Sequence, residues 1–212
     1  MASILTFDEL NVLDHENRRS EDYDEYFSGM GLTKAQKQRR IELSEKFEEE
    51  FWAVLVYLFA LFPLGLLTED TAKEKFLVAY LLVYEAVFGN DDYGPDYADK
   101  FASEVAKSTL DHVDDPYYFS KDRAMYLSEN ESETAYNHDE FEKALLNGKR
   151  YKQWVSMKDF RVRGSHRIVD DTVKLIQEPF VVGDSLMMYP KDTSFDADPE
   201  EIVNCRCIVK YI

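Results

Sequence analysis

Residues 154–171 read WVSMKDFRVRGSHRIVDD, residues 178–190 read EPFVVGDSLMMYP, and residues 200–207 read EEIVNCRC. Indole, guanidinium, imidazole and thiol groups recur in these short blocks, and glycine, proline and aspartate separate them. Short blocks bounded by turn residues are typical of strands and loops. Most of the remaining chain has the apolar spacing of helices. We therefore expect a C-terminal module that carries the function, attached to a helical scaffold.

Two arginines in the first block predict a charged strand face. Arg161 and Arg163 alternate with Phe160 and Val162. On an extended strand this alternation places both guanidinium groups on one face and the apolar pair on the other. His166 follows three residues later, after a glycine that permits a sharp change of chain direction.

The two cysteines of the chain are candidate metal ligands. On an extended C-terminal strand, Cys205 and Cys207 share one face with their Cα atoms about 6.5 Å apart, which is near the upper limit for a disulfide, so a bridge is not expected. Two thiols and a distant histidine, His166, could be three ligands of a tetrahedral zinc site. The fourth ligand stays open among His138, Asp159 and a water molecule. In the alternative interpretation, both thiols are small buried apolar groups, and the histidine forms hydrogen bonds within the core.

In order and spacing, these blocks resemble the minor head proteins of tailed bacteriophages, the head-morphogenesis family typified by the F protein of phage Mu. The resemblance covers residues 121–212, whereas the first 120 residues resemble the family only in being helical. Glu131, within RAMYLSENESETAYN, is the best match to a recurrent glutamate of the family. The matching elements are Trp154, Asp159, Arg161, Arg163, His166, Asp170, Phe180, Tyr189, Pro190, Asp192, Asn204, Cys205 and Cys207.

The chain departs from the family pattern at two turns. The family usually has Asp-Gly where this chain has Asp170 and Asp171, and it usually has Tyr-Pro-Gly-Asp where this chain has Lys191 in place of the glycine. Each change puts a Cβ atom where glycine is common. The two turns should therefore adopt another type or accept mild strain.

The resemblance implies a structural minor head protein, also called a minor capsid protein. Such a protein associates with the phage portal or the major capsid protein during head morphogenesis, and it has a role in DNA packaging or ejection. It is expected in the host cytoplasm during assembly and then in the virion, in the capsid interior or at the portal vertex. Association into a homo-oligomer is compatible with this role, and no cofactor is required.

Two other functions stay open. Some relatives of this module are fused to toxin or ADP-ribosyltransferase domains. Arg161, Arg163 and His166 beside Glu131 would suit a nuclease or toxin-like enzyme, in which the arginines stabilise charge and the histidine acts as acid or base. Against an enzyme, the sequence contains no glycine-rich phosphate loop and no nucleophile elbow. The third function is a zinc-stapled interaction module, held by His166 and the two cysteines.

The chain has 212 residues and a formal net charge of −17, which is unevenly distributed. Residues 1–150 contain 16 lysines and arginines against 32 acidic residues, whereas residues 151–212 contain 9 against 10. An acidic protein repels a phosphate backbone, so sequence-specific nucleic-acid binding is not expected. A local basic cluster suits a phosphate, or acidic groups of this chain or of a partner. It consists of Lys158, Arg161, Arg163 and Arg167.

The sequence predicts an α+β fold in three parts. Residues 1–32 form an acidic, flexible arm whose aromatic residues could dock on a partner, residues 33–150 form a helical region, and residues 151–212 form a small mixed α/β module with short, mostly antiparallel strands. The helix over residues 120–148 packs on this module. The predicted strands cover residues 154–157, 173–176, 186–189 and 206–211, with a brief helical turn over 199–203.

Capping signals predict where the helices begin and end. Thr33 and Gln36 have the spacing of a capping box, Thr68 precedes a second helix, and Ser120 precedes a long polar helix that ends before Gly148. A third helix is expected over about residues 96–112. The polar helix contains three glutamates at every second position, which point apart on a helix, so we expect them on a solvated face.

The apolar run over residues 51–67 is near the lower length limit of a membrane span. Pro63 and Gly65 lie within it, and acidic rather than basic residues flank both of its ends. A membrane span is therefore not expected, and the centre of a helical bundle is the better interpretation. The N-terminal sequence MASILTFDEL is not a signal sequence. With only two cysteines, it predicts a protein made in a reducing cytoplasm.

Overall fold

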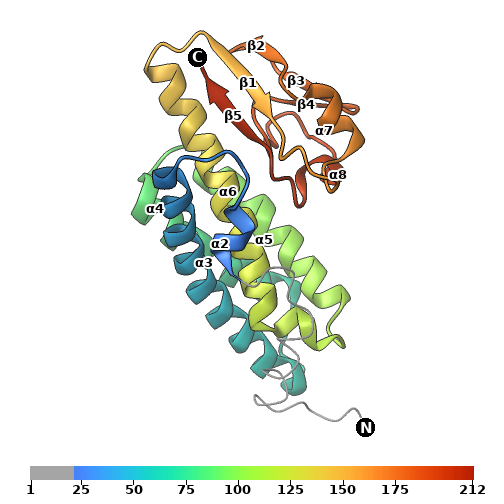
Figure 1. Ribbon diagram of the computed structural model, residues 1–212. Helices are drawn as coiled ribbons and strands as arrows, with labels where there is room; N and C mark the ends of the chain where they lie inside the picture. Colours follow the sequence, from blue (N-terminus) through green and yellow to red (C-terminus); the bar gives the residue numbers. More distant parts are fainter. Residues whose placement is uncertain (1–21) are drawn as a thin grey trace. The chain divides into compact units, whose positions relative to one another are not determined.

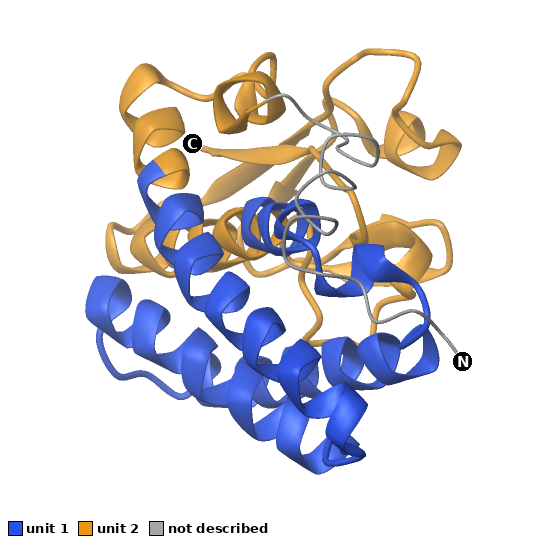
Figure 2. Ribbon diagram, turned by 90° about the horizontal axis from the view of Figure 1, so that it is seen from below, with its two compact units in different colours: residues 1–21, 42–129 blue, residues 22–41, 130–212 orange. Residues whose placement is uncertain are grey.

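The computed structural model describes residues 22–212, which form two compact units. Unit 1 contains residues 42–129, and unit 2 contains residues 22–41 and 130–212 (Figure 2). The division falls within two long helices, and each of these helices contributes to both units. They are α3 (Lys34–Leu61) and α6 (Lys121–Leu146).

Unit 1 is helical. Besides its parts of α3 and α6, it contains η1 (Phe62–Leu64), α4 (Glu69–Phe88), α5 (Tyr93–Asp111) and η2 (Pro116–Phe119) (Figure 1). Aromatic rings form much of its core. The ring of Phe101 lies 5.1 Å from that of Phe51 and 5.2 Å from that of Tyr80, measured between centroids. Packing of large rings at such distances stabilises the unit beyond the burial of their area.

The helix ends confirm the predicted capping signals. The Thr33 N–H donates to Gln36 Oε1 (3.0 Å), and the Gln36 N–H donates to Thr33 Oγ1 (3.2 Å), as in a capping box. The hydroxyl groups of Thr68 and Ser120 accept backbone N–H groups in the first turns of α4 and α6. Gly148 follows α6 with a φ of 67°, the left-handed conformation that glycine adopts without strain.

The apolar run over residues 51–67 is not one helix. It ends α3 at Leu61, continues through η1, and turns at Gly65 with a φ of 67°. Its buried residues include Phe51, Leu55 and Leu58, which pack inside unit 1. Within residues 22–212, no helix has the length and apolar character that a membrane crossing requires.

Unit 2 contains two antiparallel sheets, which confirms the predicted α+β class. The larger sheet has the strand order β2–β1–β5, and its bounds are Val173–Leu175 (β2), Tyr151–Val155 (β1) and Ile208–Tyr211 (β5). The smaller sheet is a hairpin of β3 (Phe180–Val182) and β4 (Ser185–Met187). Two short helices complete the unit, α7 (Gly164–Val169) and α8 (Pro199–Ile202) (Figure 1).

The strands differ from the predicted ones: β1 covers residues 151–155 rather than 154–157, and β5 begins at residue 208 rather than 206. β3 was not predicted, although its Phe180 and Val182 are fully buried. β4 ends at Met187 rather than at Tyr189. The chain leaves the strand there because the Met188 N–H donates to the Asp192 carboxylate (2.7 Å) instead of to a neighbouring strand.

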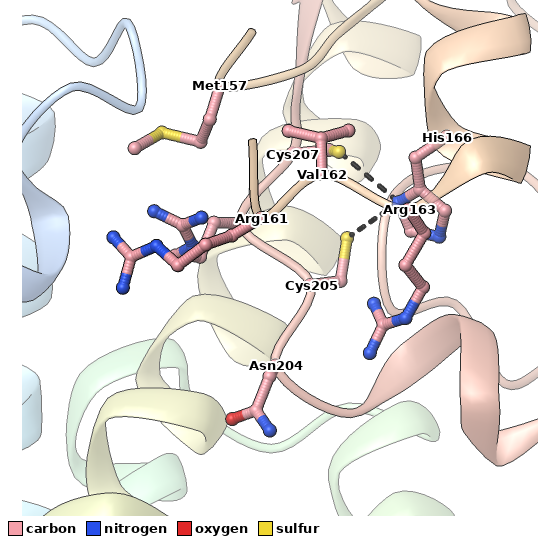
Figure 3. A pocket seen from close by; sticks show the side chains of 9 residues that line it. Met157, Arg161, Val162, Arg163, His166, Asn204, Cys205 and Cys207 are labelled. Atoms are coloured by element: carbon pink, nitrogen blue, oxygen red, sulfur yellow. Dashed lines mark hydrogen bonds between the residues drawn. The ribbon is translucent and has the colours of Figure 1, made fainter. Parts of the chain in front are cut away.

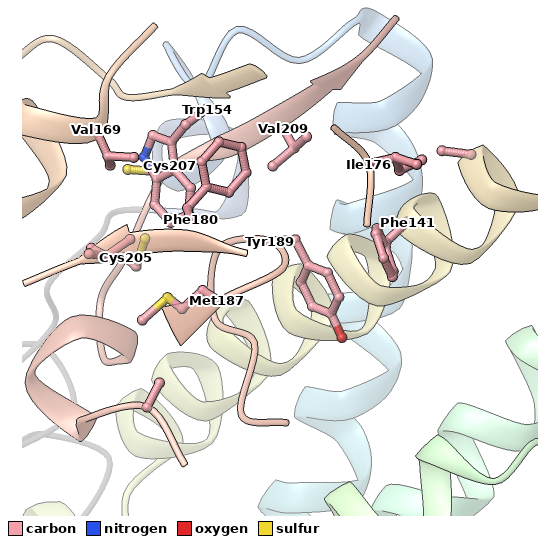
Figure 4. Close-up of a cluster of buried hydrophobic side chains, with 13 residues drawn as sticks. Phe141, Trp154, Val169, Ile176, Phe180, Met187, Tyr189, Cys205, Cys207 and Val209 are labelled. Atoms are coloured by element: carbon pink, nitrogen blue, oxygen red, sulfur yellow. The ribbon is translucent and has the colours of Figure 1, made fainter. Parts of the chain in front are cut away.

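The core of unit 2 combines residues from α6 with residues from the sheets. Trp154 is fully buried, and its ring packs edge-on against Phe180 with 5.3 Å between centroids (Figure 4). Phe141 and Ala144 of α6 belong to the same cluster, as do both cysteines. The compact unit thus includes residues 130–150, before the predicted boundary at residue 151, and the helix that was expected to pack on the module supplies part of its core.

The predicted extended arm lies partly outside the described residues, which begin at residue 22. Its described part is not extended, because it contains the helix α2 (Tyr23–Phe27), capped by Asp22. Phe27 is 1% exposed, and the Tyr26 hydroxyl donates to Glu133 Oε2 (3.2 Å). For these residues the prediction was wrong, because burial of the aromatic side chains in unit 2 outweighs the polar character of the segment.

Candidate functional site

His166 is held in place by bonds at the end of its own helix, α7. The Asp170 carboxylate accepts the Ser156 N–H (2.7 Å) and pairs with Lys158 (3.5 Å). These contacts tie the C-terminal end of α7 to the segment that follows β1. The imidazole is only 2% exposed, and Trp154 packs edge-on against it, with 5.6 Å between centroids.

The two cysteines lie in an irregular segment between α8 and β5. Asn204 turns this segment with a φ of 56°, and the Cys205 N–H donates to the Ile202 carbonyl (3.1 Å). The predicted strand face for the two thiols was wrong, because pairing with β1 begins only at Ile208. Both thiols are nevertheless free and buried.

The imidazole and both thiols converge on one point. His166 Nδ1 lies 3.3 Å from Cys207 Sγ and 3.5 Å from Cys205 Sγ (Figure 3). The three atoms all lie within 4.8 Å of one another, and all three residues are buried. This convergence groups the three residues that the sequence indicated as metal ligands.

Glu201 completes the cluster, and the sequence analysis did not identify it. Its Oε2 lies 2.9 Å from His166 Nε2 and accepts the Ser165 hydroxyl (2.7 Å). Gly183 leaves room for this carboxylate, since a Cβ atom on Gly183 would collide with Glu201 Oε1. Glu200 and Glu201 are adjacent, and no local pattern distinguishes the one that reaches the imidazole.

The imidazole and the two thiols of the cluster change one another's pKa values. Burial acts to lower the pKa of His166, but the hydrogen bond and charge of Cys205 and the charge of Glu201 outweigh it and raise the pKa. Burial acts to raise the pKa of Cys205, but hydrogen bonds from Cys207 and His166 lower it well below its ordinary value. The hydrogen bond to Cys205, together with burial, raises the pKa of Cys207. Without a metal, the cluster therefore favours a Cys205 thiolate paired with a His166 imidazolium.

The predicted strand with two arginines is absent from this region of unit 2. The segment turns at residues 159–162, where the Asp159 carboxylate accepts the Arg161 N–H (3.0 Å) and its carbonyl accepts the Val162 N–H (3.3 Å). Arg161 points outward with its side chain 62% exposed, whereas Arg163 donates to the Val203 carbonyl (Figure 3). The aspartate side chain competes for backbone N–H groups, which explains why a turn forms instead of a strand.

A small pocket adjoins the cluster and encloses about 20 Å³, enough for one water molecule or ion. Arg161, Arg163 and His166 all line it, together with Cys205 and Cys207 (Figure 3). Its lining does not include the glutamate at position 131. The structure thus brings together three of the four residues of the alternative nuclease centre but not its proposed carboxylate.

The three glutamates at every second position of α6 are not on a solvated face, so that prediction was wrong. Glu129, Glu131 and Glu133 are 3%, 7% and 0% exposed. Glu133 Oε2 pairs with Lys191 Nζ (3.3 Å), which is itself 1% exposed. Burial raises the pKa of Glu133 to about 7, although the charges of Lys191 and Arg40 act in the opposite direction.

The two turns with substituted glycines keep a left-handed backbone. Asp171 has a φ of 60° and Lys191 a φ of 67°, which confirms the predicted strain. The Lys191 ammonium also donates to the carbonyl (3.3 Å) and side-chain oxygen (2.9 Å) of Asn130. The lysine thus combines a strained backbone with a buried set of polar contacts.

The other family-motif residues hold the module together. The Asp192 carboxylate accepts the Met188 and Ser194 N–H groups (2.7 and 2.9 Å), and the Pro190 carbonyl accepts the Asn137 amide (3.1 Å). Asn137 in turn accepts a bond from the Arg40 guanidinium (3.2 Å). These residues therefore build the scaffold around the cluster.

Two candidates for a fourth metal ligand are engaged elsewhere. His138 Nδ1 lies 2.9 Å from the Tyr189 hydroxyl. The Asp159 carboxylate pairs with Arg206 (2.8 Å). Among the described residues, neither belongs to the group of ligand atoms that includes His166. The basic cluster makes contacts within the chain: Lys158 Nζ lies 2.6 Å from the Asp171 carboxylate. Arg163 and Arg167 donate to backbone carbonyls rather than to acidic groups.

Comparison with known proteins places the chain in a family. No curated protein and no solved structure shows a significant match to it. The sequence model of the family described as "Phage Mu protein F like protein" matches residues 97–210, which is more than half of the chain. The matched range contains α6, the strands β1 to β4, β5 except for Tyr211, and the His166, Cys205 and Cys207 cluster. The chain therefore belongs to the phage Mu protein F like family.

Proposed function

We propose that this chain is a structural minor head protein of a tailed bacteriophage, which associates with the portal or the inner capsid during head morphogenesis. Family membership makes it a phage head-related protein, and this single observation carries the proposal. The following details belong to our proposal. The protein is present in few copies per head, it contacts the portal or the major capsid protein, and it takes part in packaging or ejecting DNA.

The way in which unit 2 uses its motif residues supports a structural role. Asp170 and Asp192 accept backbone N–H groups that fix turns, and Trp154 fills the core. Polar side chains used in this way hold a rigid surface in shape rather than meet a substrate. The net charge of −17 also argues against binding of a nucleic-acid backbone.

Two large apolar side chains near α7 provide a candidate docking surface. Phe160 is 89% exposed and Ile168 is 84% exposed. The Arg167 guanidinium donates to the Phe160 carbonyl (2.9 Å), which holds the loop against α7. The Arg161 side chain, next to Phe160 in the sequence, is 62% exposed, although its Nε also lies 3.7 Å from the Asp159 carboxylate. Aromatic and arginine side chains are favoured anchors of protein interfaces, so we assign this surface to another head protein with an apolar, acidic patch.

A complementation experiment tests the role. A phage with a nonsense codon in the gene for this chain is grown in cells that supply either the wild-type chain or the Phe160→Ser, Ile168→Ser double variant. The variant should fold normally, but its copies per purified head should fall by roughly tenfold or more. Leu146→Ser, which changes an 85% exposed apolar residue of α6, is the matched control and should be incorporated normally.

Cross-linking mass spectrometry of the same heads identifies the partner. Links between the segment around Phe160 and the portal or the major capsid protein are expected. Normal incorporation of the double variant would overturn the docking surface, and absence of the wild-type chain from heads would overturn the structural role itself. The purified chain should also not turn over DNA, RNA or NAD; turnover that His166→Ala abolishes would favour the enzyme.

A further inference from the structure

We propose that His166, Cys205 and Cys207 bind one zinc ion through Nδ1 and the two sulfur atoms, with Glu201 orienting the imidazole. The proposal does not depend on the proposed role in the phage head. The argument rests on the geometry of the three ligand atoms, on the bond to Glu201, and on the adjoining pocket.

The spacing of the ligand atoms fits a tetrahedral ion. With Zn–S near 2.3 Å and Zn–N near 2.0 Å, a tetrahedral site requires about 3.5 Å between nitrogen and sulfur. The two distances from His166 Nδ1 are 3.3 and 3.5 Å. One imidazole nitrogen has a single proton or a single lone pair, so it cannot form two well-directed hydrogen bonds to two sulfurs. A shared ion explains why both sulfurs approach the same nitrogen.

Glu201 sets the form of the imidazole that a metal requires. Its Oε2 lies 2.9 Å from Nε2, which holds a proton on Nε2, so that Nδ1, once it gives up its own proton, would offer its lone pair to an ion shared with the two sulfurs. A carboxylate behind a ligating histidine is the usual arrangement in zinc sites. The Ser165 hydroxyl holds the same oxygen (2.7 Å), and Gly183 provides the space.

The two thiolate ligands decide which metal ion the site favours. Soft sulfur ligands favour zinc over magnesium or calcium, which prefer oxygen. The pocket beside the cluster has room for one water molecule, and we assign this water as the fourth ligand, since His138 and Asp159 are engaged elsewhere. Arg161 and Arg163 line the same pocket. The ion would join α7 to the segment before β5.

Metal content of the full chain is the direct test. Chain purified from zinc-supplemented cells should contain about one zinc per molecule by elemental analysis. After removal of zinc by a chelator, titration with Co²⁺ should produce a sulfur-to-cobalt charge-transfer absorption that saturates at one equivalent. Cys205→Ser and Cys207→Ser should each lose this absorption, whereas His138→Ala, the matched histidine control, should keep it.

The role of Glu201 has its own readout. Glu201→Gln should retain the cobalt absorption but weaken metal affinity by about 10- to 100-fold, and Glu200→Gln, a change of the adjacent exposed carboxylate, should not weaken it. Equal affinity of both variants would overturn the orienting role. If a cysteine variant does not fold, the wild-type titration still decides. A folded wild-type chain with neither zinc nor cobalt absorption would overturn the site and leave a thiolate–imidazolium pair.

Discussion

Among the residues with a left-handed backbone, Lys191 and Asp171 differ in the contacts that offset the strain. Lys191 is buried, and its ammonium pairs with Glu133. Asp171 is exposed, and its carboxylate pairs with Lys158, whose side chain is 56% exposed. An exposed pair contributes at most about 1 kcal/mol, whereas breaking a buried pair costs several. The same backbone strain is therefore offset strongly at Lys191 and weakly at Asp171.

Replacement of each residue by glycine separates these effects. Above pH 7, where Glu133 is ionised, Lys191→Gly relieves about 1 kcal/mol of strain but leaves this buried carboxylate without its charge partner, so the free energy of unfolding should fall by about 2–3 kcal/mol. Asp171→Gly is the matched control and should stay within about 1 kcal/mol of wild type. Chemical denaturation measures both. Equal effects of the two changes would contradict a stabilising role for the buried contacts of Lys191.

The raised pKa of Glu133 predicts how stability depends on pH. With a folded pKa of about 7 and an ordinary value of 4.5, the folded protein holds a proton in this window that the unfolded chain has lost. The free energy of unfolding should therefore fall as pH rises from 4.5 to 7 and then level off. The groups that act on this carboxyl are Lys191, Arg40, Cys205 and the Tyr26 hydroxyl.

Glu133→Gln removes this titration. The stability of wild type relative to this variant should decline by at most about 3 kcal/mol between pH 4.5 and 7. Urea denaturation at a series of pH values gives the two curves. Parallel curves would show that Glu133 does not titrate in this window.

At the scale of elements, local sequence signals predicted where the long helices begin but did not predict the short elements. The starts of α3, α4 and α6 were predicted because a capping side chain lies three residues from its backbone partner. α2, α7 and β3 were not predicted, because they are short and depend on side chains buried against distant segments. The sequence also gave no reason to choose Glu201, since its role depends on the approach of α8 to α7.

Phe27 is the most deeply buried side chain of the helix α2, which is expected to depend on it. Phe27 is 1% exposed, so Phe27→Ala should cost about 3–5 kcal/mol and release residues 22–30. Limited proteolysis should then cut in this segment before the rest of the chain. Thr33→Ala, which removes only a helix cap, should cost about 1 kcal/mol and leave the segment protected. Equal protection of both variants would mean that Phe27 does not anchor α2.

At the scale of the whole molecule, the sequence predicted the α+β class but not how the chain is divided. The helical part and the mixed module were separated at residue 151, where charge and composition change. The structure instead groups residues 22–41 and 130–212, because Phe141 and Ala144 fill the same core as Trp154. Composition reports average character, and it does not show which helix face completes a core.

Because residues 130–150 belong to the same compact unit as residues 151–212, we predict that residues 151–212 alone will not fold. That fragment lacks Phe141 and Ala144 and also lacks Glu133, the buried partner of Lys191. Its amide resonances should show little dispersion in a ¹H–¹⁵N spectrum, whereas those of the full chain should be well dispersed. A folded fragment would show that α6 is dispensable for this core.

Burial of the two thiols bears on how long an infective particle lasts outside its host. A virion in soil or water has no enzymes to reduce oxidised sulfur, so damage accumulates there. Cys205 and Cys207 are only 1% and 2% exposed, and the pocket that they line has room for little more than one water molecule, so peroxide attacks them mainly when the surrounding residues open. If the protein has the proposed role, the rate at which its thiols are oxidised in the virion should follow the frequency with which unit 2 opens. A rise in temperature should then increase this rate more than added oxidant does.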